Sequence, residues 1–248
     1  MIFFDFCAKS ESMKERTLQI LSALIRDFVE TGNPVASQKL LLLSKDFDIS
    51  SATVRNEFSL LEEVGLIKSP HVSAGKVPTQ KGYRFFVDEL LENTKEEELV
   101  QAIFEKYIAE YRLSKSKEIL FDIVRLLSQL SGNVAFATVD NDRTFYLGLS
   151  NVMRSPEFVM QPEKAAQIVE ILEGKERFRT MIESLDLEGK IKIFIGEENL
   201  LEEITSCAMV VARFETSRIS GTIGLLGPMR MKYGFNKALI KNALEMIL

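Results

Sequence analysis

Residues 49–88 constrain the fold of this chain most strongly, because they predict a helix, a basic turn-rich stretch and a second helix in close succession. Ser50 and Ser51 can cap the first helix, since a serine oxygen accepts from the unpaired amides of the first turn. Gly65 supplies the left-handed residue that ends it. Between these ends, apolar residues recur at helical spacing and predict one buried face: Val54, Phe58, Leu61 and Val64.

The opposite face of this helix carries side chains that can read DNA. They are Thr53, Arg55, Asn56 and Ser59. In a major groove arginine favours guanine and asparagine favours adenine, so we expect Arg55 and Asn56 to face bases. Two other roles stay open. Arg55 could pair with Glu62, and Asn56 could cap the helix locally or bond to a neighbouring helix.

A basic stretch follows the helix. Residues 64–87 contain no Asp or Glu, and their basic or titratable side chains are Lys68, His71, Lys76, Lys81 and Arg84. Two short strands, 66–67 and 76–77, flank a turn-forming loop. The local excess of positive charge predicts contact with phosphates. An ordinary solvated surface is the alternative for the lysines and Arg84, and packing within the loop is the alternative for His71.

The segments around this stretch complete a small domain. Thr79 can cap the next helix, in which we expect Tyr83 and Phe86 to lie in the core. Upstream, Leu18, Leu21, Ile25 and Phe28 predict a first amphipathic helix, and 37–43 predict a short second one. Three helices and a hairpin in this order indicate a winged helix-turn-helix, in which one helix enters the groove and the wing lies along the backbone. About ninety residues suffice for one small core.

The rest of the chain predicts an α+β sheet domain. Helical spacing is found near 99–108 and 117–130, at 164–172 and 175–185, and from about 236. Strand patterns are found at 134–139, 144–149, 191–195, 208–214 and 221–226. The Gly227–Met231 segment lacks the spacing of a phosphate loop and predicts a turn at the sheet edge.

Composition excludes several classes of protein. The 248 residues carry a net charge of −5, and residues 1–90 carry −1, so attraction to DNA must come from a local patch. Two cysteines without metal or redox spacing fit a reducing compartment. No apolar run is long enough to span a membrane, and the apolar start lacks the basic residues of a signal peptide. One histidine and no catalytic motif predict a protein that is not an enzyme and has no cofactor or metal.

Several stretches resemble the heat-inducible transcription repressor family, HrcA. They are ETGNPVASQKL, SSATVRNE, LEEVGLIKSPHVSAGKVPTQKGYRFFVD, IGEENLLEEITSCAMVVARF and GLLGPMRM. The wing signature PHVSAGKVPTQKGYRF is the most specific of them. The resemblance implies a cytoplasmic, dimeric repressor of heat-shock (chaperone) operons that binds an inverted-repeat operator and is released on heat stress. It also implies a GroEL-type chaperonin as a partner, and a GAF-like second domain.

The chain departs from the family in the middle. Typical members carry a long stretch between the strand resembling 134–139 and the segment resembling 146–158, whereas here little more than 140–143 joins the two. We therefore expect a reduced second domain without the inserted dimerisation element. Met229 stands where threonine is usual, and Lys232 where an acidic residue is common.

These observations predict an α+β protein with an N-terminal winged helix-turn-helix followed by a reduced GAF-like sheet domain. The expected division is an N-terminal extension (1–12), a winged helix DNA-binding domain (13–91), a helical linker (92–130) and the GAF-like domain (131–248). The expected DNA-binding residues are Ser51, Thr53, Arg55, Asn56, His71, Ser73, Lys76, Thr79, Lys81 and Arg84. The alternative function is a ligand- or protein-sensing module whose winged helix does not bind DNA specifically.

Overall fold

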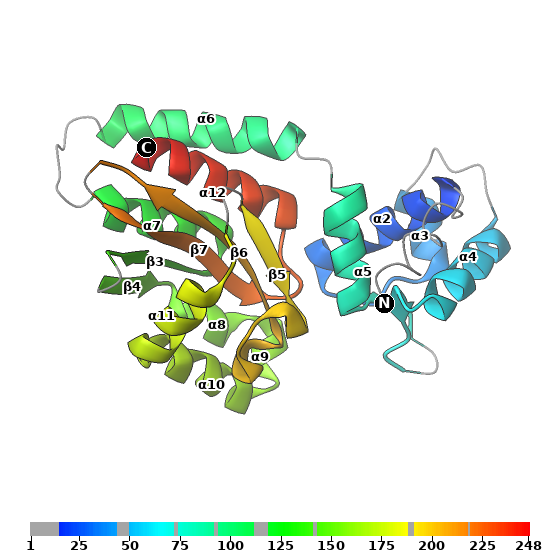
Figure 1. Ribbon diagram of the computed structural model, residues 1–248. Coiled ribbons are helices and arrows are strands. Elements are labelled where there is room, and N and C mark those ends of the chain that lie inside the picture. The colour runs from blue at the N-terminus through cyan, green and yellow to red at the C-terminus, as the bar shows by residue number, and fades with distance from the viewer. Residues whose placement is uncertain are drawn as a thin grey trace. The chain divides into compact units, whose positions relative to one another are not determined.

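The computed structural model of the chain is shown in Figure 1. It describes residues 15–43, 50–71, 74–91, 94–111, 119–140, 143–187, 191–217 and 219–248. The expected extension 1–12, the turn at 141–142 and the candidate site residue Ser73 lie outside the described residues. The chain divides into two compact units, 1–91 and 92–248.

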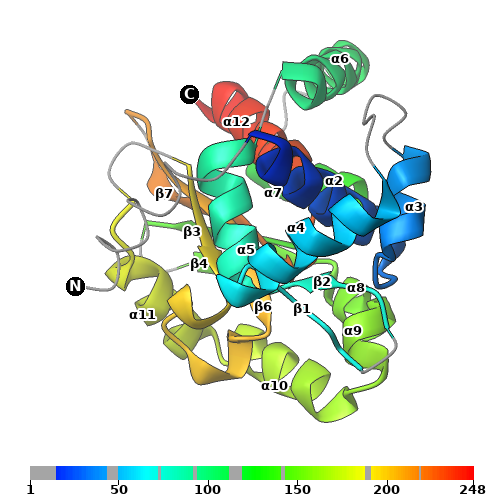
Figure 2. The ribbon, with the colours of Figure 1, turned by 90° about the vertical axis from the view of Figure 1, so that its right-hand side faces the viewer.

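Unit 1 (residues 1–91) is a small helical unit with a two-stranded hairpin (Figure 2). Its elements are α2 (Glu15–Thr31), α3 (Ser37–Leu43), α4 (Ser51–Glu63), β1 (Ile67–Lys68), β2 (Val77–Pro78), α5 (Gln80–Phe85) and a π-helical turn, η1 (Phe86–Leu90). The predicted helices are present, and the two strands are each shifted by one residue from their predicted positions. β1 and β2 pair antiparallel, with Ile67 opposite Pro78.

The core of unit 1 comes from the apolar positions that the helical spacing picks out. Side chains less than 5% exposed include Leu21, Ile25, Val54, Phe58, Leu61, Tyr83 and Phe86. The prediction that Tyr83 and Phe86 lie in the core is confirmed. The Arg26 guanidinium stacks over the Phe86 ring at 5.5 Å from its centroid, which adds a cation–π contact to the burial of the ring.

Unit 2 (residues 92–248) is built on a five-stranded antiparallel sheet in the order β4-β3-β7-β6-β5. The strands are β3 (Val134–Val139), β4 (Arg143–Leu147), β5 (Lys192–Ile195), β6 (Cys207–Glu215) and β7 (Ser220–Pro228). The helices are α6 (Thr94–Tyr111), α7 (Ile119–Ser131), α8 (Leu149–Arg154), α9 (Pro156–Val159), α10 (Pro162–Glu173), α11 (Lys175–Ser184) and α12 (Tyr233–Ile247), and two 3-10 turns are η2 (Gly196–Glu198) and η3 (Glu202–Ile204). The predicted α+β class is confirmed.

Helices cover both faces of the sheet. α7 and α12 pack on one face and α6 lies against α12, whereas α8 to α11 gather on the other (Figure 1). On this second face Phe136 meets Phe178 edge-on, with ring centroids 5.0 Å apart. Phe136 lies across Gly224 of the paired strand, where a Cβ atom would come within 2.5 Å of the ring. Among the described residues no helix has both the length and the apolar character needed to cross a membrane.

Two expectations for unit 2 are wrong. The strand predicted to reach 149 ends at Leu147, because Gly148 adopts φ 90° and turns the chain into α8. Neither α8 nor α9 was expected. The segment 227–231 starts with the last two residues of β7 and bends at 229–230, but β7 lies between β3 and β6 in the middle of the sheet and not at its edge. Tyr233 holds this turn by donating from its hydroxyl to the Met229 carbonyl at 2.5 Å.

Cys207 provides a test of the core of unit 2. Its side chain is buried where β6 begins, and burial raises the pKa of the thiol to about 12. An unfolded cysteine has a pKa of about 8.5, and the thiolate is the reactive form. In a Cys7→Ser variant, where Cys207 is the only thiol, we expect a thiol reagent at pH 8 to react slowly with the folded protein and rapidly in urea. Equal rates in the two conditions would contradict the burial.

Candidate nucleic-acid interface

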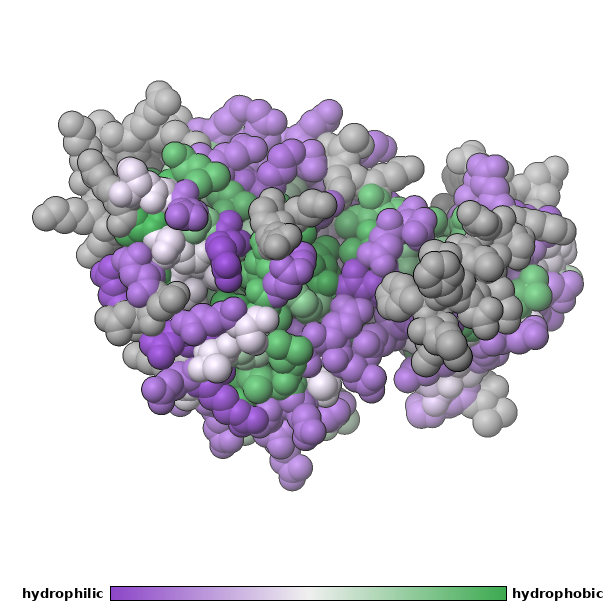
Figure 3. Space-filling model, in the orientation of Figure 1, coloured by the Kyte–Doolittle hydropathy of each residue, from purple (hydrophilic) through white to green (hydrophobic). Residues whose placement is uncertain are grey.

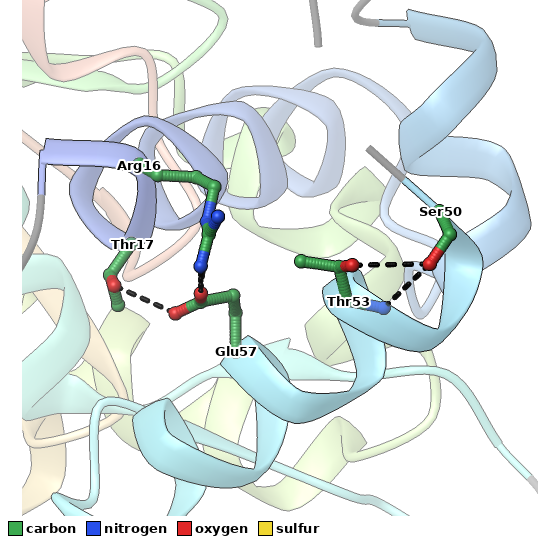
Figure 4. Close-up of polar contacts among 5 residues, drawn as sticks. All are labelled: Arg16, Thr17, Ser50, Thr53 and Glu57. Atoms are coloured by element: carbon green, nitrogen blue, oxygen red, sulfur yellow. Dashed lines mark hydrogen bonds and ion pairs between the residues drawn. The ribbon is translucent and has the colours of Figure 1, made fainter. Parts of the chain in front are cut away.

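Helix α4 separates an apolar face from a polar one. Ser50 accepts from the Thr53 amide at 3.2 Å and lies 3.1 Å from the Thr53 hydroxyl, so the predicted serine cap is confirmed (Figure 4). Gly65 follows the helix with φ 76°, as predicted. The polar face of α4, which we define as Arg55, Asn56 and Ser59, is exposed.

The side chains of Arg55 and Asn56 point to solvent. The alternative pairing of Arg55 with Glu62 is not observed, because the Glu62 carboxylate binds Ser69 and Lys76 instead. Within the part of the chain that the structure describes, neither Arg55 nor Asn56 shows a side-chain hydrogen bond or ion pair. Thr53 is half-buried and its hydroxyl belongs to the cap, whereas Ser51 is half-buried beside it.

A buried carboxylate joins α4 to α2, and sequence reasoning missed it. Glu57 is 4% exposed although it lies on the apolar side of α4. One of its oxygens accepts from Arg16 Nε at 3.0 Å and Nη2 at 2.6 Å, and the other accepts from the Thr17 hydroxyl at 2.7 Å (Figure 4). The available signal was the position of Glu57 three residues after Val54, in the apolar stripe. An acid at such a position needs a partner, because an unpaired buried charge is strongly destabilising.

The hairpin is attached to the rest of unit 1 by its backbone. Val35 and Lys76 exchange two hydrogen bonds of 2.9 Å each, which adds residue 35 as a neighbour of the second strand. Gly75 permits this approach, since a Cβ atom there would lie 2.5 Å from the Val35 carbonyl carbon. Thr79 caps α5 by accepting from the Gly82 amide at 3.0 Å and also donates to the Gly65 carbonyl at 2.7 Å.

Three of the expected basic contacts have partners within the chain. Lys76 pairs with Glu62 at 2.5 Å, and Arg84 pairs with Asp88 at 2.9 Å. Lys81 donates to the Val64 carbonyl at 2.9 Å. The stretch 64–87 therefore contains no acidic residue, but Glu62 and Asp88, just outside it, supply carboxylates that pair with its basic side chains. His71 is exposed on the loop between the strands. Lys68, at the end of β1, is also exposed, although it was not among the expected DNA contacts.

A second feature lies in unit 2, where an open groove of 660 Å³ runs along α11. Its apolar lining includes Met181, Leu200 and Leu201, and Figure 3 shows hydrophobic residues on this face of the unit. Arg177 reaches the groove but pairs with Glu203 at 2.5 Å. Among the described residues no group of three or more His, Cys, Asp or Glu side chains could hold a metal ion.

The structure thus defines an α+β protein of two compact units, with an exposed polar helix face in the first. The family model for the HrcA protein C-terminal domain matches residues 76–235, which is more than half of the chain. The chain belongs to the HrcA family.

Two relatives that align with nearly the whole chain are named "Heat-inducible transcription repressor HrcA". The protein from Desulforamulus reducens is 27% identical, covering 89% of this chain and 92% of the relative. The protein from Lachnoclostridium phytofermentans is 26% identical with the same coverage. Because 89% of 248 residues is about 221, roughly a hundred of the 322 positions aligned with the first relative face a gap in this chain. The chain is a shortened member by that comparison.

A solved structure shares the fold. A crystal structure of a hypothetical protein at 2.2 Å resolution matches with a TM-score of 0.73, covering 95% of this chain and 98% of that chain. The two sequences are 17% identical, so this likeness concerns the fold alone.

The Glu57 contacts predict a local loss of stability. Replacing Glu57 with Ala leaves the Thr17 hydroxyl buried without its partner and Arg16 without its counter-charge. We expect Glu57→Ala to lower the protection of α2 and α4 amides against hydrogen exchange by about 2–3 kcal/mol. Glu63→Ala, which removes an exposed carboxylate from the same helix, should change it by less than about 0.5 kcal/mol. Equal effects of the two variants would show that the buried contacts do not hold the helices together.

Proposed function

We propose that this protein is a transcription repressor of heat-shock (chaperone) operons, and that it binds an inverted-repeat DNA operator as a homodimer. Membership of the HrcA family and the naming of its relatives as heat-inducible transcription repressors support the repressor role. The structural observation that carries DNA binding is the polar face of α4, where the Arg55 and Asn56 side chains are exposed and show no hydrogen bond or ion pair among the described residues.

In this proposal unit 1 is a winged helix-turn-helix. α3 and α4 form the helix-turn-helix, with α4 as the recognition helix, and the β1–β2 hairpin is the wing. Arg55 and Asn56 approach base edges, where a bidentate contact discriminates between bases. Ser51 and Thr53 lie in the first turn of α4, where the positive end of the helix dipole favours a phosphate.

The wing is proposed to supply contacts to the DNA backbone. The candidates from sequence are His71, which is exposed, and Ser73, which lies outside the described residues. Lys81 and Arg84 are proposed as phosphate contacts, although each has a partner within the chain. Exposed ion pairs contribute only about 0–1 kcal/mol, so a phosphate can replace Asp88 as the partner of Arg84. Thr79 is better assigned to positioning the wing, because its hydroxyl already bonds to three backbone groups.

The remaining parts of the proposal rest on the resemblance. Unit 2 is proposed to be a reduced GAF-like domain, and a GroEL-type chaperonin is proposed to keep the repressor active. Action in the cytoplasm follows from a repressor's need to reach the chromosome. A homodimer would place two copies of α4 in successive major grooves of a symmetric operator.

One observation favours a second candidate function. The groove along α11, with its apolar lining, could take a small molecule or a peptide. A ligand- or protein-sensing module in which unit 1 does not bind DNA specifically would make use of this groove.

Arg55 tests the recognition role of α4. Arg55→Ala should weaken binding to the operator by about 1–3 kcal/mol and weaken binding to random duplex much less, because the lost contacts are to bases. Arg213→Ala removes an exposed arginine from unit 2 and should leave both affinities unchanged. Titrations of both duplexes at one salt concentration measure the difference. Equal losses of Arg55→Ala on the two duplexes would contradict base reading by α4.

A further inference from the structure

A single carboxylate near the end of α4 contacts both sides of the hairpin loop. One oxygen of Glu62 accepts from the Ser69 amide at 3.1 Å and from the Ser69 hydroxyl at 3.3 Å. The other accepts from Lys76 Nζ at 2.5 Å, and Lys76 also donates to the Ser69 hydroxyl at 2.8 Å. We call these three residues the Glu62 cluster.

The Glu62 cluster contacts the hairpin loop at both of its ends. Ser69 comes directly after β1 and Lys76 directly before β2. Every residue of the loop tip, His71 included, therefore lies between two points held by the same carboxylate. Because Glu62 belongs to α4, the cluster ties the base of the loop to the helix that carries Arg55 and Asn56.

We propose that Glu62 is a positioning residue that sets the register between the recognition helix and the wing, and that Lys76 serves this cluster rather than a phosphate. This inference rests on the proposed function, since the register matters when α4 and the wing grip the same duplex. It departs from the expectation that Lys76 is a backbone contact.

The electrostatics of the cluster support this assignment. The hydrogen bond from Lys76 holds the pKa of the Glu62 carboxyl below its ordinary value, so the carboxylate is charged at neutral pH. Lys76 is the better covered of the two side chains, at 20% exposed against 41% for Glu62. A lysine whose charge is already matched by a carboxylate releases few counterions when DNA arrives.

The backbone around Lys76 limits its movement further. Its amide and carbonyl groups both bond to Val35, at 2.9 Å each. A Lys76 side chain that turned to a phosphate would leave Glu62 near the DNA without a counter-charge, and like charges would then repel. Keeping the pair intact avoids that repulsion.

The test compares two neighbouring glutamates. Glu62→Gln and Glu63→Gln remove the same charge from the same helix, but no contact of the cluster involves Glu63. We expect Glu62→Gln to lower the ratio of operator to random-duplex affinity about tenfold, the size of coupling that contacting residues commonly show. We also expect its salt slope to steepen by about one unit, because Lys76 becomes available to a phosphate. Glu63→Gln should change neither quantity.

A second variant separates positioning from phosphate contact. If Lys76 serves the cluster, Lys76→Met should lower the ratio of operator to random-duplex affinity as Glu62→Gln does, and it should leave the salt slope unchanged. In the double variant, the loss in this ratio should be little larger than in Glu62→Gln alone. A slope that falls by about one unit in Lys76→Met alone would overturn the assignment of Lys76. Identical behaviour of Glu62→Gln and Glu63→Gln would overturn the role of Glu62.

A measurement without DNA keeps this inference distinct from the repressor proposal. The carboxyl carbon of Glu62, followed by NMR through an acid titration, should show a depressed pKa that rises toward its ordinary value in Lys76→Met, because the hydrogen bond from Lys76 is the largest cause of the depression. If the pKa behaves so and the wild-type protein binds no duplex, the repressor proposal fails while the cluster remains. An ordinary Glu62 pKa in the wild type would overturn the cluster itself.

Discussion

The contact between Glu57 and its two partners on α2 determines how α4 is presented. Glu57 is a carboxylate in the apolar stripe of a helix, and it is tolerated because Arg16 and Thr17 satisfy both of its oxygens. These contacts and the burial of Val54, Phe58 and Leu61 turn one side of α4 toward the core, so the opposite side faces solvent. That side is where Arg55 and Asn56 lie. The polar face of α4 is thus a consequence of how its buried face is held.

Glu62 holds the same helix through a second set of contacts. Glu57 holds α4 to the core, and Glu62 connects it to the hairpin loop. Together the two carboxylates connect α2, α4 and the hairpin loop. The backbone bonds of Val35 to Lys76 and the cap formed by Thr79 complete the frame. A helix and a wing that grip one duplex need such a frame, because contacts to phosphates and to bases must be made together.

The local features of this fold were predictable from sequence, and the contacts between distant residues were not. The Ser50 cap, the Gly65 end of α4 and the cap by Thr79 each depend on residues a few positions apart, so spacing rules reach them. Arg16 and Glu57 are 41 residues apart, and Glu62 and Lys76 are 14 apart. No periodicity connects such pairs. For that reason Lys76 looked like an unpaired cation in an acid-free stretch, and Glu57 was overlooked. In unit 2 the strands followed from short apolar runs bounded by turn residues, whereas α8 depended on the φ of Gly148, which such runs cannot reveal.

We propose that α4, held by Glu57 and flanked by the wing, reads a symmetric operator near chaperone genes. A footprint of the purified full chain on the chaperone promoters of its own genome tests this claim most directly, with random-sequence DNA as the control and a series of salt concentrations. The account predicts protection of two half-sites, with centres about one helical turn or a multiple of it apart. Absence of protection at every salt concentration, or uniform protection of promoter and control DNA, would contradict it.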